Sequence, residues 1–275
     1  MSNSATKSFI ALGTKLRRTD VPTSASVRRF SSVDALRANR ATSNVDGLFR
    51  INVERGVFTA ACDPKVELQV LDSKPKDRHL LLMARVPTYI GQKLTGFKKE
   101  KFLCGHDERD WFVAAVPAKA TTVITAKEAL RPAAVTERVI QAGVSKRKEH
   151  KHRNAAFVRQ GEWFFTPEPN LKVNPAMILK NEPLVRADNR GGKPHMVQEL
   201  YREGGQTVYV HPRLAPFGQV EPPKDMAGWR LMKRNPAAFA RGSVRHADHA
   251  TVTFKIWHRI HMNTESRRQS LGFLD

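Results

Sequence analysis

Alternating hydrophobic and polar positions run along most of the chain and predict a protein rich in β-strands. Phe49, Ile51 and Val53 alternate with polar neighbours, and residues 57–62 follow directly after an Arg-Gly pair. This pattern is typical of a half-buried hairpin with a tight turn. Shorter hydrophobic runs bounded by charged, Gly or Pro residues predict further strands at residues 79–86, 102–104, 111–116, 155–158, 162–165, 206–210 and 251–262.

Helix signals are fewer and shorter. Thr125 is followed three residues later by Glu128, which is the spacing of a capping box, and Pro132 ends the segment. A second helix is predicted over residues 136–142, where Gly143 supplies the C-terminal cap. Both helices are too short to form a separate helical layer, so the sequence indicates short helices on a sheet-based protein.

A third helix is predicted over residues 194–203. Pro194 suits a first helical position and Gly204 a helix end. A single apolar stripe on such a helix would contain Met196, Val197, Leu200 and Tyr201. The segment that follows, residues 212–236, contains five prolines and predicts a long surface loop.

These elements predict an α+β protein, β-rich, with a mainly antiparallel sheet, a few short helices and long Pro-rich loops. Residues 46–275 are expected to form the folded body, as one domain or as two subdomains that divide near residues 133–153. Apolar runs are far shorter than a membrane span. Two cysteines, Cys62 and Cys104, are too few for a disulfide framework and predict free thiols in a reducing compartment.

Residues 1–45 have a different composition, rich in Ser, Thr, Ala and Arg, with few acids and no clear hydrophobic period. We expect this segment to be a disordered basic arm. An alternative is a mitochondrial transit peptide, which has the same composition, with residues 27–32 as the cleavage region. The first interpretation implies a cytoplasmic protein and the second a protein of the mitochondrial matrix.

Charge is the strongest indication of a partner. The 275 residues include 47 Lys and Arg but only 26 Asp and Glu, which gives a net charge of +21. The surplus runs along the whole chain and is largest in residues 1–50 and 201–275. Such a positive field attracts polyanions, so RNA or DNA is the expected partner.

Three segments are the candidates for nucleic-acid contact. The densest basic cluster lies in residues 145–153, and Lys193 precedes the third predicted helix. In residues 251–262, strict alternation places Val252, Phe254, Ile256, His258, Ile260 and Met262 on a core face, and the opposite face carries cations beside an indole that could stack on a base. The predicted contact residues are Lys146, Arg147, Lys148, Lys151, Arg153, Lys193, Lys255, Trp257 and Arg259.

One histidine cluster is a candidate for metal binding or catalysis. His246, Asp248 and His249 fall within four residues, and two imidazoles at this spacing can reach one ion. Asp248 would be a further ligand or would orient an imidazole. Zinc or magnesium would then be the cofactor, and the alternative is a polar turn that needs no cofactor. A complete site would need ligands from elsewhere in the chain.

The sequence therefore favours a non-catalytic nucleic-acid-binding protein of low sequence specificity, using a basic sheet face and a basic arm. The first alternative is a metal-dependent hydrolase, most simply a nuclease, centred on His246, Asp248 and His249. The second alternative is a structural subunit of a nucleoprotein particle, for which an oligomer would be expected.

Overall fold

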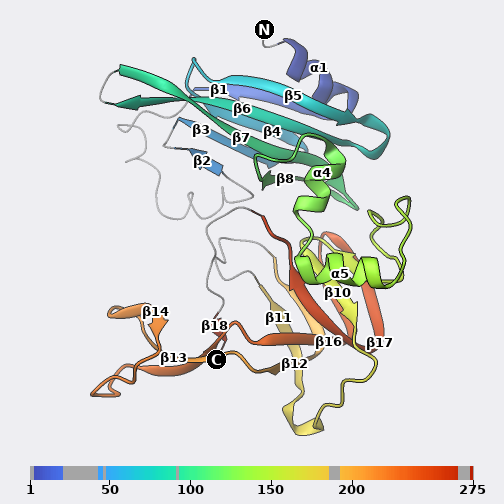
Figure 1. Cartoon of the computed structure of the whole chain (residues 1–275), viewed down its shortest axis with the longest axis vertical. Coiled ribbons are helices and arrows are strands. Elements are labelled where there is room, and N and C mark those ends of the chain that lie inside the picture. Colours follow the sequence, from blue (N-terminus) through green and yellow to red (C-terminus); the bar gives the residue numbers. More distant parts are fainter. Residues whose placement is uncertain are drawn as a thin grey trace. The chain divides into compact units, whose positions relative to one another are not determined.

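The computed structural model describes residues 3–20, 43–45, 48–90, 93–185, 193–265 and 273–274. Contacts divide the chain into two compact units, which are described separately. The N-terminal unit comprises residues 1–132, 190–192 and 263–267, and the C-terminal unit comprises residues 133–189, 193–262 and 268–275. Nearly all strand pairs are antiparallel and the described α-helices are short (Figure 1), which confirms the predicted β-rich α+β class.

Two four-stranded sheets form the N-terminal unit. The first has the order β1-β4-β3-β2, and its strands are β1 (Lys15–Thr19), β2 (Ser43–Val45), β3 (Phe49–Glu54) and β4 (Val57–Cys62). The second has the order β5-β6-β7-β8, with β5 (Glu67–Lys74), the 3-10 turn η1 (Pro75–Asp77), β6 (His79–Ile90), β7 (Lys93–Asp107) and β8 (Asp110–Val116).

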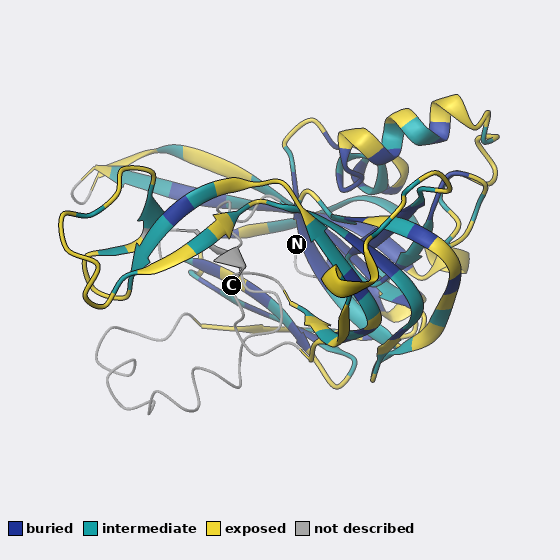
Figure 2. Cartoon of the chain, turned by 90° about the horizontal axis from the view of Figure 1, so that it is seen from below, coloured by how far each residue is buried: buried dark blue, intermediate teal, exposed yellow. Residues whose placement is uncertain are grey.

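Both faces of the second sheet are buried. One face packs on the first sheet, where alternate residues of each strand, such as Ile51, Phe58, Leu82 and Phe102, form one hydrophobic core. The opposite face packs on helix α4 (Val123–Ala129) through Leu81 and its neighbours. This burial explains why residues 79–86 read as a continuous apolar run. In Figure 2 the buried positions follow the strands, while exposed residues dominate the helices and loops.

The predicted disorder of residues 1–45 is wrong for the part that the structure describes. Residues 3–19 form helix α1 (Asn3–Ala11) and strand β1, which pairs in parallel with β4. Phe9 is fully buried, and its ring lies 4.9 Å from that of Phe58. The predicted cleavage region, residues 27–32, lies outside the described residues. The apolar stretch near Phe9 therefore belongs to a hydrophobic core, although it is too short to show a period.

Helix α4 begins earlier than the sequence predicts. Thr122 is the N-cap, and its hydroxyl accepts from the Thr125 backbone N–H at 3.1 Å. The Thr125 hydroxyl in turn accepts from the Thr122 N–H at 2.9 Å, so Thr125 takes the reciprocal role that the sequence assigned to Glu128. The second helix, α5 (Ala133–Gln141), also begins three residues early and ends before Gly143, whose φ is +58°.

A six-stranded sheet forms the body of the C-terminal unit. Its order is β11-β12-β16-β17-β10-β9, and its strands are β9 (Val158–Gln160), β10 (Trp163–Pro167), β11 (Leu179–Leu184), β12 (His195–Glu203), β16 (Ala237–His246) and β17 (His249–Met262). A 3-10 turn, η2 (Pro175–Met177), precedes β11. The inner face holds a core that includes Phe165, Leu200 and Phe254. A smaller core beneath α5 includes Phe157 and Phe164.

A second sheet of this unit has the order β14-β13-β15-β18. Its strands are β13 (Gln206–His211), β14 (Ala215–Gln219), β15 (Arg230–Arg234) and β18 (Phe273–Leu274). The β13–β15 ladder continues the pairing of β12 with β16 past Gly205, whose φ is +81°. The predicted loop over residues 212–236 thus contains two strands, because Pro216 lies in the edge strand β14 and the other four prolines lie outside the strands.

The helix predicted at residues 194–203 is wrong, since this segment is strand β12. The register shifts between Val197 and Glu199, which marks a β-bulge. The extra residue lies in β16, where residues 242 and 243 stand opposite Gln198. Val197 and Leu200 of β12, three residues apart, both face the inner core. This spacing imitates the apolar stripe of a helix. Among the described residues, no helix is both long enough and apolar enough to cross a membrane.

Candidate metal centre

Three histidines from three strands meet at one end of the six-stranded sheet. His195 begins β12, His246 ends β16 and His249 begins β17. His246 is paired with His249 across the β16–β17 hairpin, and the neighbouring β12–β16 pair is Met196 with Arg245. One ligand nitrogen from each ring lies within 4.8 Å of the other two. We call these three residues the His centre.

The three rings are close and nearly parallel. The centroids of His195 and His246 are 4.1 Å apart with an interplanar angle of 21°. His249 lies 4.7 Å from His246 and 5.6 Å from His195. The ring of Trp163, which is 6% exposed, makes an edge contact with His195. The His centre is therefore bounded on one side by the inner core of the sheet.

A hairpin closes over the His centre. Its turn contains Gly161, between Gln160 and Trp163 of β9 and β10. The Gln160 side chain is fully buried and donates to the carbonyl oxygens of Val244 and Ala250 at 3.2 and 2.6 Å. These two bonds join the turn to the backbone of β16 and β17. The hairpin therefore lies across the inner face of its own sheet.

Gly161 provides the space in front of two of the imidazoles. Its φ is +58°, a conformation that residues with a side chain rarely adopt. A Cβ atom at this position would lie 2.8 Å from Nε2 of His249 and 3.4 Å from Nε2 of His195. Both nitrogens thus face the same small volume beside the glycine, and a larger residue would fill it.

His195 is 2% exposed, and its Nε2 has no hydrogen-bond partner. A buried polar atom without a partner costs free energy, so its retention indicates that something else satisfies it. Burial, and then the charges of the two neighbouring imidazoles, lower the pKa of His195 to about 3. His195 is therefore neutral at pH 7, which is the form that binds metal ions.

His246 is held by backbone groups at both nitrogens. Its Nε2 donates to the carbonyl oxygen of Lys193 at 3.0 Å, and its Nδ1 accepts from the Asp248 N–H at 3.1 Å. A ring N–H bonded to a backbone carbonyl is the usual second contact of a metal-binding histidine. Nδ1 is then the nitrogen available to an ion, and binding would exchange the Asp248 amide for the metal. Burial also lowers the pKa of His246.

Two segments that the sequence treated as separate candidates belong to this one site. The Lys193 ammonium forms an ion pair with the Asp248 carboxylate at 2.7 Å, beside the Lys193 carbonyl that binds His246. The segment predicted to contact nucleic acid through Lys193 therefore supplies a third imidazole, His195, to the pair predicted to bind metal. Asp248 lies next to the His centre, and its carboxylate is paired with Lys193. Nothing in the sequence links Gly161 and His195 to residues 246–249, because both lie far from that segment along the chain.

The donor set fits a transition metal. Three imidazoles suit zinc and its neighbours, whereas magnesium prefers oxygen ligands in an octahedral arrangement. Three protein ligands with one remaining position are typical of catalytic zinc sites. The residues present thus fit zinc, one of the two predicted ions, better than magnesium.

The other predicted contact residues fall into two groups. Residues 146–153 form turns and bends between α5 and β9. The exposed cations of this segment are Lys146, Arg147, Lys148, Lys151 and Arg153. Lys146 forms an ion pair with the buried Glu149 at 3.2 Å. Lys255 and Arg259 are exposed on β17.

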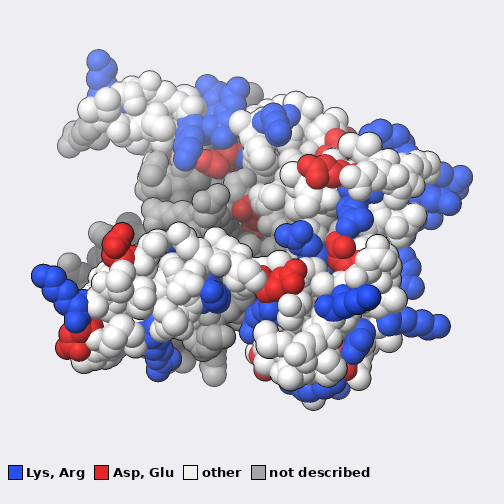
Figure 3. All heavy atoms as spheres, turned by 60° about the horizontal axis from the view of Figure 1, so that its bottom comes forward, with Lys and Arg blue, Asp and Glu red and all other residues white. Residues whose placement is uncertain are grey.

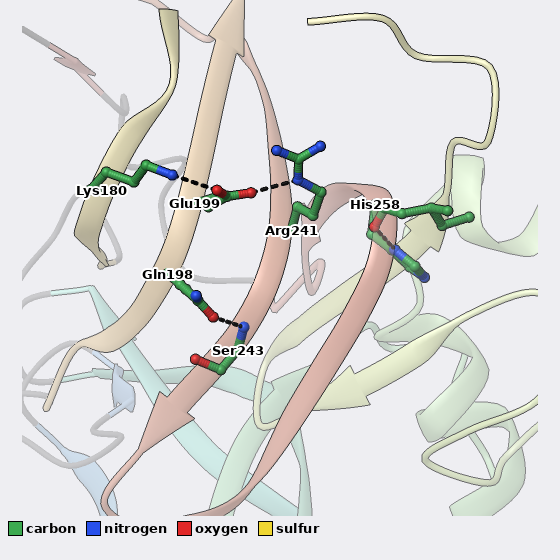
Figure 4. A network of polar contacts seen from close by, with 7 residues as sticks. Lys180, Gln198, Glu199, Arg241, Ser243 and His258 are labelled. Atoms are coloured by element: carbon green, nitrogen blue, oxygen red, sulfur yellow. Dashed lines mark hydrogen bonds and ion pairs between the residues drawn. The ribbon is translucent and has the colours of Figure 1, made fainter. Parts of the chain in front are cut away.

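Trp257 is not available as a stacking platform. It is 5% exposed, with the Arg241 guanidinium 4.6 Å from the ring centroid and the Tyr201 ring 6.3 Å away. Glu199 holds Arg241 in place and also pairs with Lys180 (Figure 4). The alternation predicted for β17 fails in the same region, because Ile256 is 41% exposed. Three residues of β17 lie opposite Arg241, between the Ala240–His258 and Gly242–Phe254 pairs, so the alternation is interrupted there and resumes with Ile260 in the same core as Phe254.

Charge on the visible surface is divided. Figure 3 shows Lys and Arg in several separate groups with Asp and Glu among them.

Comparison with known proteins finds no matching family model, no matching curated protein and no matching solved structure. The interpretation of the His centre therefore depends on the geometry of this chain alone.

Proposed function

We propose that the chain is a metal-dependent hydrolase whose zinc ion is bound by His195, His246 and His249. The observation that carries this proposal is the convergence of three imidazoles from three strands, with ligand atoms within 4.8 Å, beside a glycine that leaves room for an ion. Zinc bound by three residues lowers the pKa of a fourth-position water to about 7 and so supplies hydroxide.

The residues around the His centre favour a negatively charged substrate. Lys193 lies beside the centre, paired with Asp248. The net charge of +21 attracts a polyanion over the whole chain. A phosphodiester, and hence a nuclease activity, is the simplest substrate class that fits both features.

A second candidate is a nucleic-acid-binding protein without catalysis, free or as a subunit of a nucleoprotein particle. The charge of +21 and the exposed cations in residues 146–153 support it. Its proposed sheet platform at Trp257 loses support because that ring is buried. The two cysteines, Cys62 and Cys104, are free thiols, as is typical of proteins in a reducing compartment. Removal of residues 1–30 by a transit protease would take away α1 and β1. The cytoplasm is therefore part of this proposal.

The two candidates are separated by metal analysis and a cleavage assay on the full chain. We expect about one zinc per chain after purification, and hydrolysis of a single-stranded oligonucleotide that stops with a chelator and returns with zinc. His249→Ala should lose zinc and cleavage but retain oligonucleotide binding. Zinc-free protein that gains no stability from added zinc, or cleavage that persists in His249→Ala, would overturn the proposal.

A further inference from the structure

Strands β6 and β7 continue as a two-stranded arm beyond the rest of their sheet. The last β5–β6 pair is Glu67 with Arg85, and the last β7–β8 pair is Lys101 with Val116. Residues 86–90 and 93–98 pair only with each other in the described ladders. Figure 1 shows this hairpin running past its neighbours. In the described ladders, both edges of the arm are thus free of flanking strands.

Cross-strand pairing determines which side chains share one face of the arm. Directly paired residues lie on the same side of a ladder, and positions two apart in a strand return to that side. Arg85 pairs with Lys99, Pro87 with Phe97, and Tyr89 with Leu94 across a register shift. Lys65 joins them, since its ammonium lies 5.4 Å from the centroid of the Tyr89 ring. We call Lys65, Arg85, Tyr89, Leu94, Phe97 and Lys99 the cationic-aromatic face.

Cations and rings alternate on this face. The Arg85 guanidinium lies 4.1 Å from the centroid of Phe97, and Lys65 is similarly placed near Tyr89. Phe97 is 37% exposed and Leu94 43%. Lys65 and Lys99 are exposed, and Arg85 is partly neutralised by Glu67 at 3.0 Å. Large apolar side chains exposed beside cations indicate a binding surface rather than a solvated sheet face.

We propose that the cationic-aromatic face of the β6–β7 arm binds single-stranded nucleic acid. Phosphates would contact Lys65 and Lys99, while unpaired bases stack on Phe97 and on the guanidinium that lies against it. Sheet surfaces that bind single strands combine these two elements, because every base has a face that stacks and every nucleotide carries a negative charge. This site lies in the N-terminal unit and does not depend on the His centre.

An anionic membrane is the alternative occupant. A hairpin that inserts into a bilayer carries its apolar residues at the tip, with cations behind them. Here Ile90, at the tip, is paired with Lys93, and the rings lie further back between cations. The arrangement therefore favours a nucleic-acid strand.

Fluorescence anisotropy with a labelled oligothymidylate and an oligouridylate of equal length tests the proposal, in a chelator so that metal and cleavage play no part. The logarithm of the binding constant falls linearly with the logarithm of salt concentration, by about 0.7 for each phosphate contact to a single strand. The double variant Lys65→Ala, Lys99→Ala should therefore reduce this slope by about 1.4. Phe97→Leu should lower affinity roughly tenfold and leave the slope unchanged.

The matched control is Lys76→Ala in η1. Lys76 is exposed and lies beyond the opposite end of β6, so its removal should change neither affinity nor slope beyond the general effect of one charge. The proposal is overturned if the double variant keeps the full slope, or if Phe97→Leu binds as tightly as wild type. It is equally overturned if the arm variants lose binding to phosphatidylserine vesicles while oligonucleotide binding is unchanged. Because zinc content is not measured here, failure of this proposal leaves the hydrolase proposal unaffected.

Discussion

Replacement of Gly161 by alanine tests the geometry of the His centre directly. The new Cβ would lie 2.8 Å from Nε2 of His249 and 3.4 Å from Nε2 of His195. The first distance is shorter than any normal contact, so the His249 ring must move and the space for an ion is lost. The backbone adds a second penalty, because φ is +58° at this glycine.

Gly143 provides a matched control. Its φ is also +58°, it belongs to the same unit, and a Cβ there would have nothing within 4 Å. Gly143→Ala should therefore show only the left-handed backbone penalty, about 1–2 kcal/mol. Gly161→Ala should show the same penalty plus the cost of overpacking, about 1–3 kcal/mol. The difference between the two variants isolates the contact with the imidazoles.

Urea unfolding followed by tryptophan fluorescence measures this difference in the C-terminal unit, where Trp163, Trp229 and Trp257 lie. Each protein is measured with a chelator and with zinc. At a zinc concentration one hundred times its dissociation constant, wild type and Gly143→Ala should gain about 2.7 kcal/mol. Gly161→Ala should gain nothing. Equal loss of stability in both variants, or an undiminished zinc effect in Gly161→Ala, would refute the reasoning.

Two further predictions concern stability. Phe9→Ala should cost about 3–5 kcal/mol of unfolding free energy in the N-terminal unit, because the ring is fully buried against Phe58. Ile10→Ala on the same helix, where the side chain is 60% exposed, should cost little. Equal effects of the two substitutions in thermal denaturation would show that α1 is not docked. Burial, and then the charges of Arg259 and Arg138, lower the pKa of His261 to about 4. As the pH falls from about 6.5 towards 4, the imidazole is therefore protonated in the unfolded chain but not in the folded one, and the free energy of unfolding decreases. His261→Gln should flatten that part of the urea-measured stability profile, by up to about 2 kcal/mol at pH 5, and an unchanged profile would contradict the assignment.

Local signals in the sequence were sufficient for most of the strands. Residues 49–54 and 57–62 form the predicted hairpin, and the strand predicted at residues 251–262 is observed as β17. Strand β6 runs on past Pro87, which the sequence took as its end, because at this point the arm has no neighbouring strand that needs the missing N–H. Alternation reports which residues are half-buried, and this property is local.

Predictions from hydrophobic spacing were wrong where the strand pairing is irregular, at β12 and β17. At β12, opposite the bulge in β16, Val197 and Leu200 both face the core, so their three-residue spacing indicated a helix. At β17 the irregular pairing opposite Arg241 buries Trp257, and the predicted platform is lost. A bulge depends on the pairing partner, and a single strand gives no sign of it.

Composition and short-range spacing therefore determined the β-rich class, the positive charge and the pairing of His246 with His249. Only the tertiary structure could add His195 and Gly161, which lie more than fifty and eighty residues away in sequence from that pair. The tertiary structure also places Phe9 in a hydrophobic core and Phe97 beside Arg85, which the sequence did not predict. The physical reason is that alternation and spacing act between neighbours along the chain, whereas a site and a core require strand order and register, which bring distant residues together.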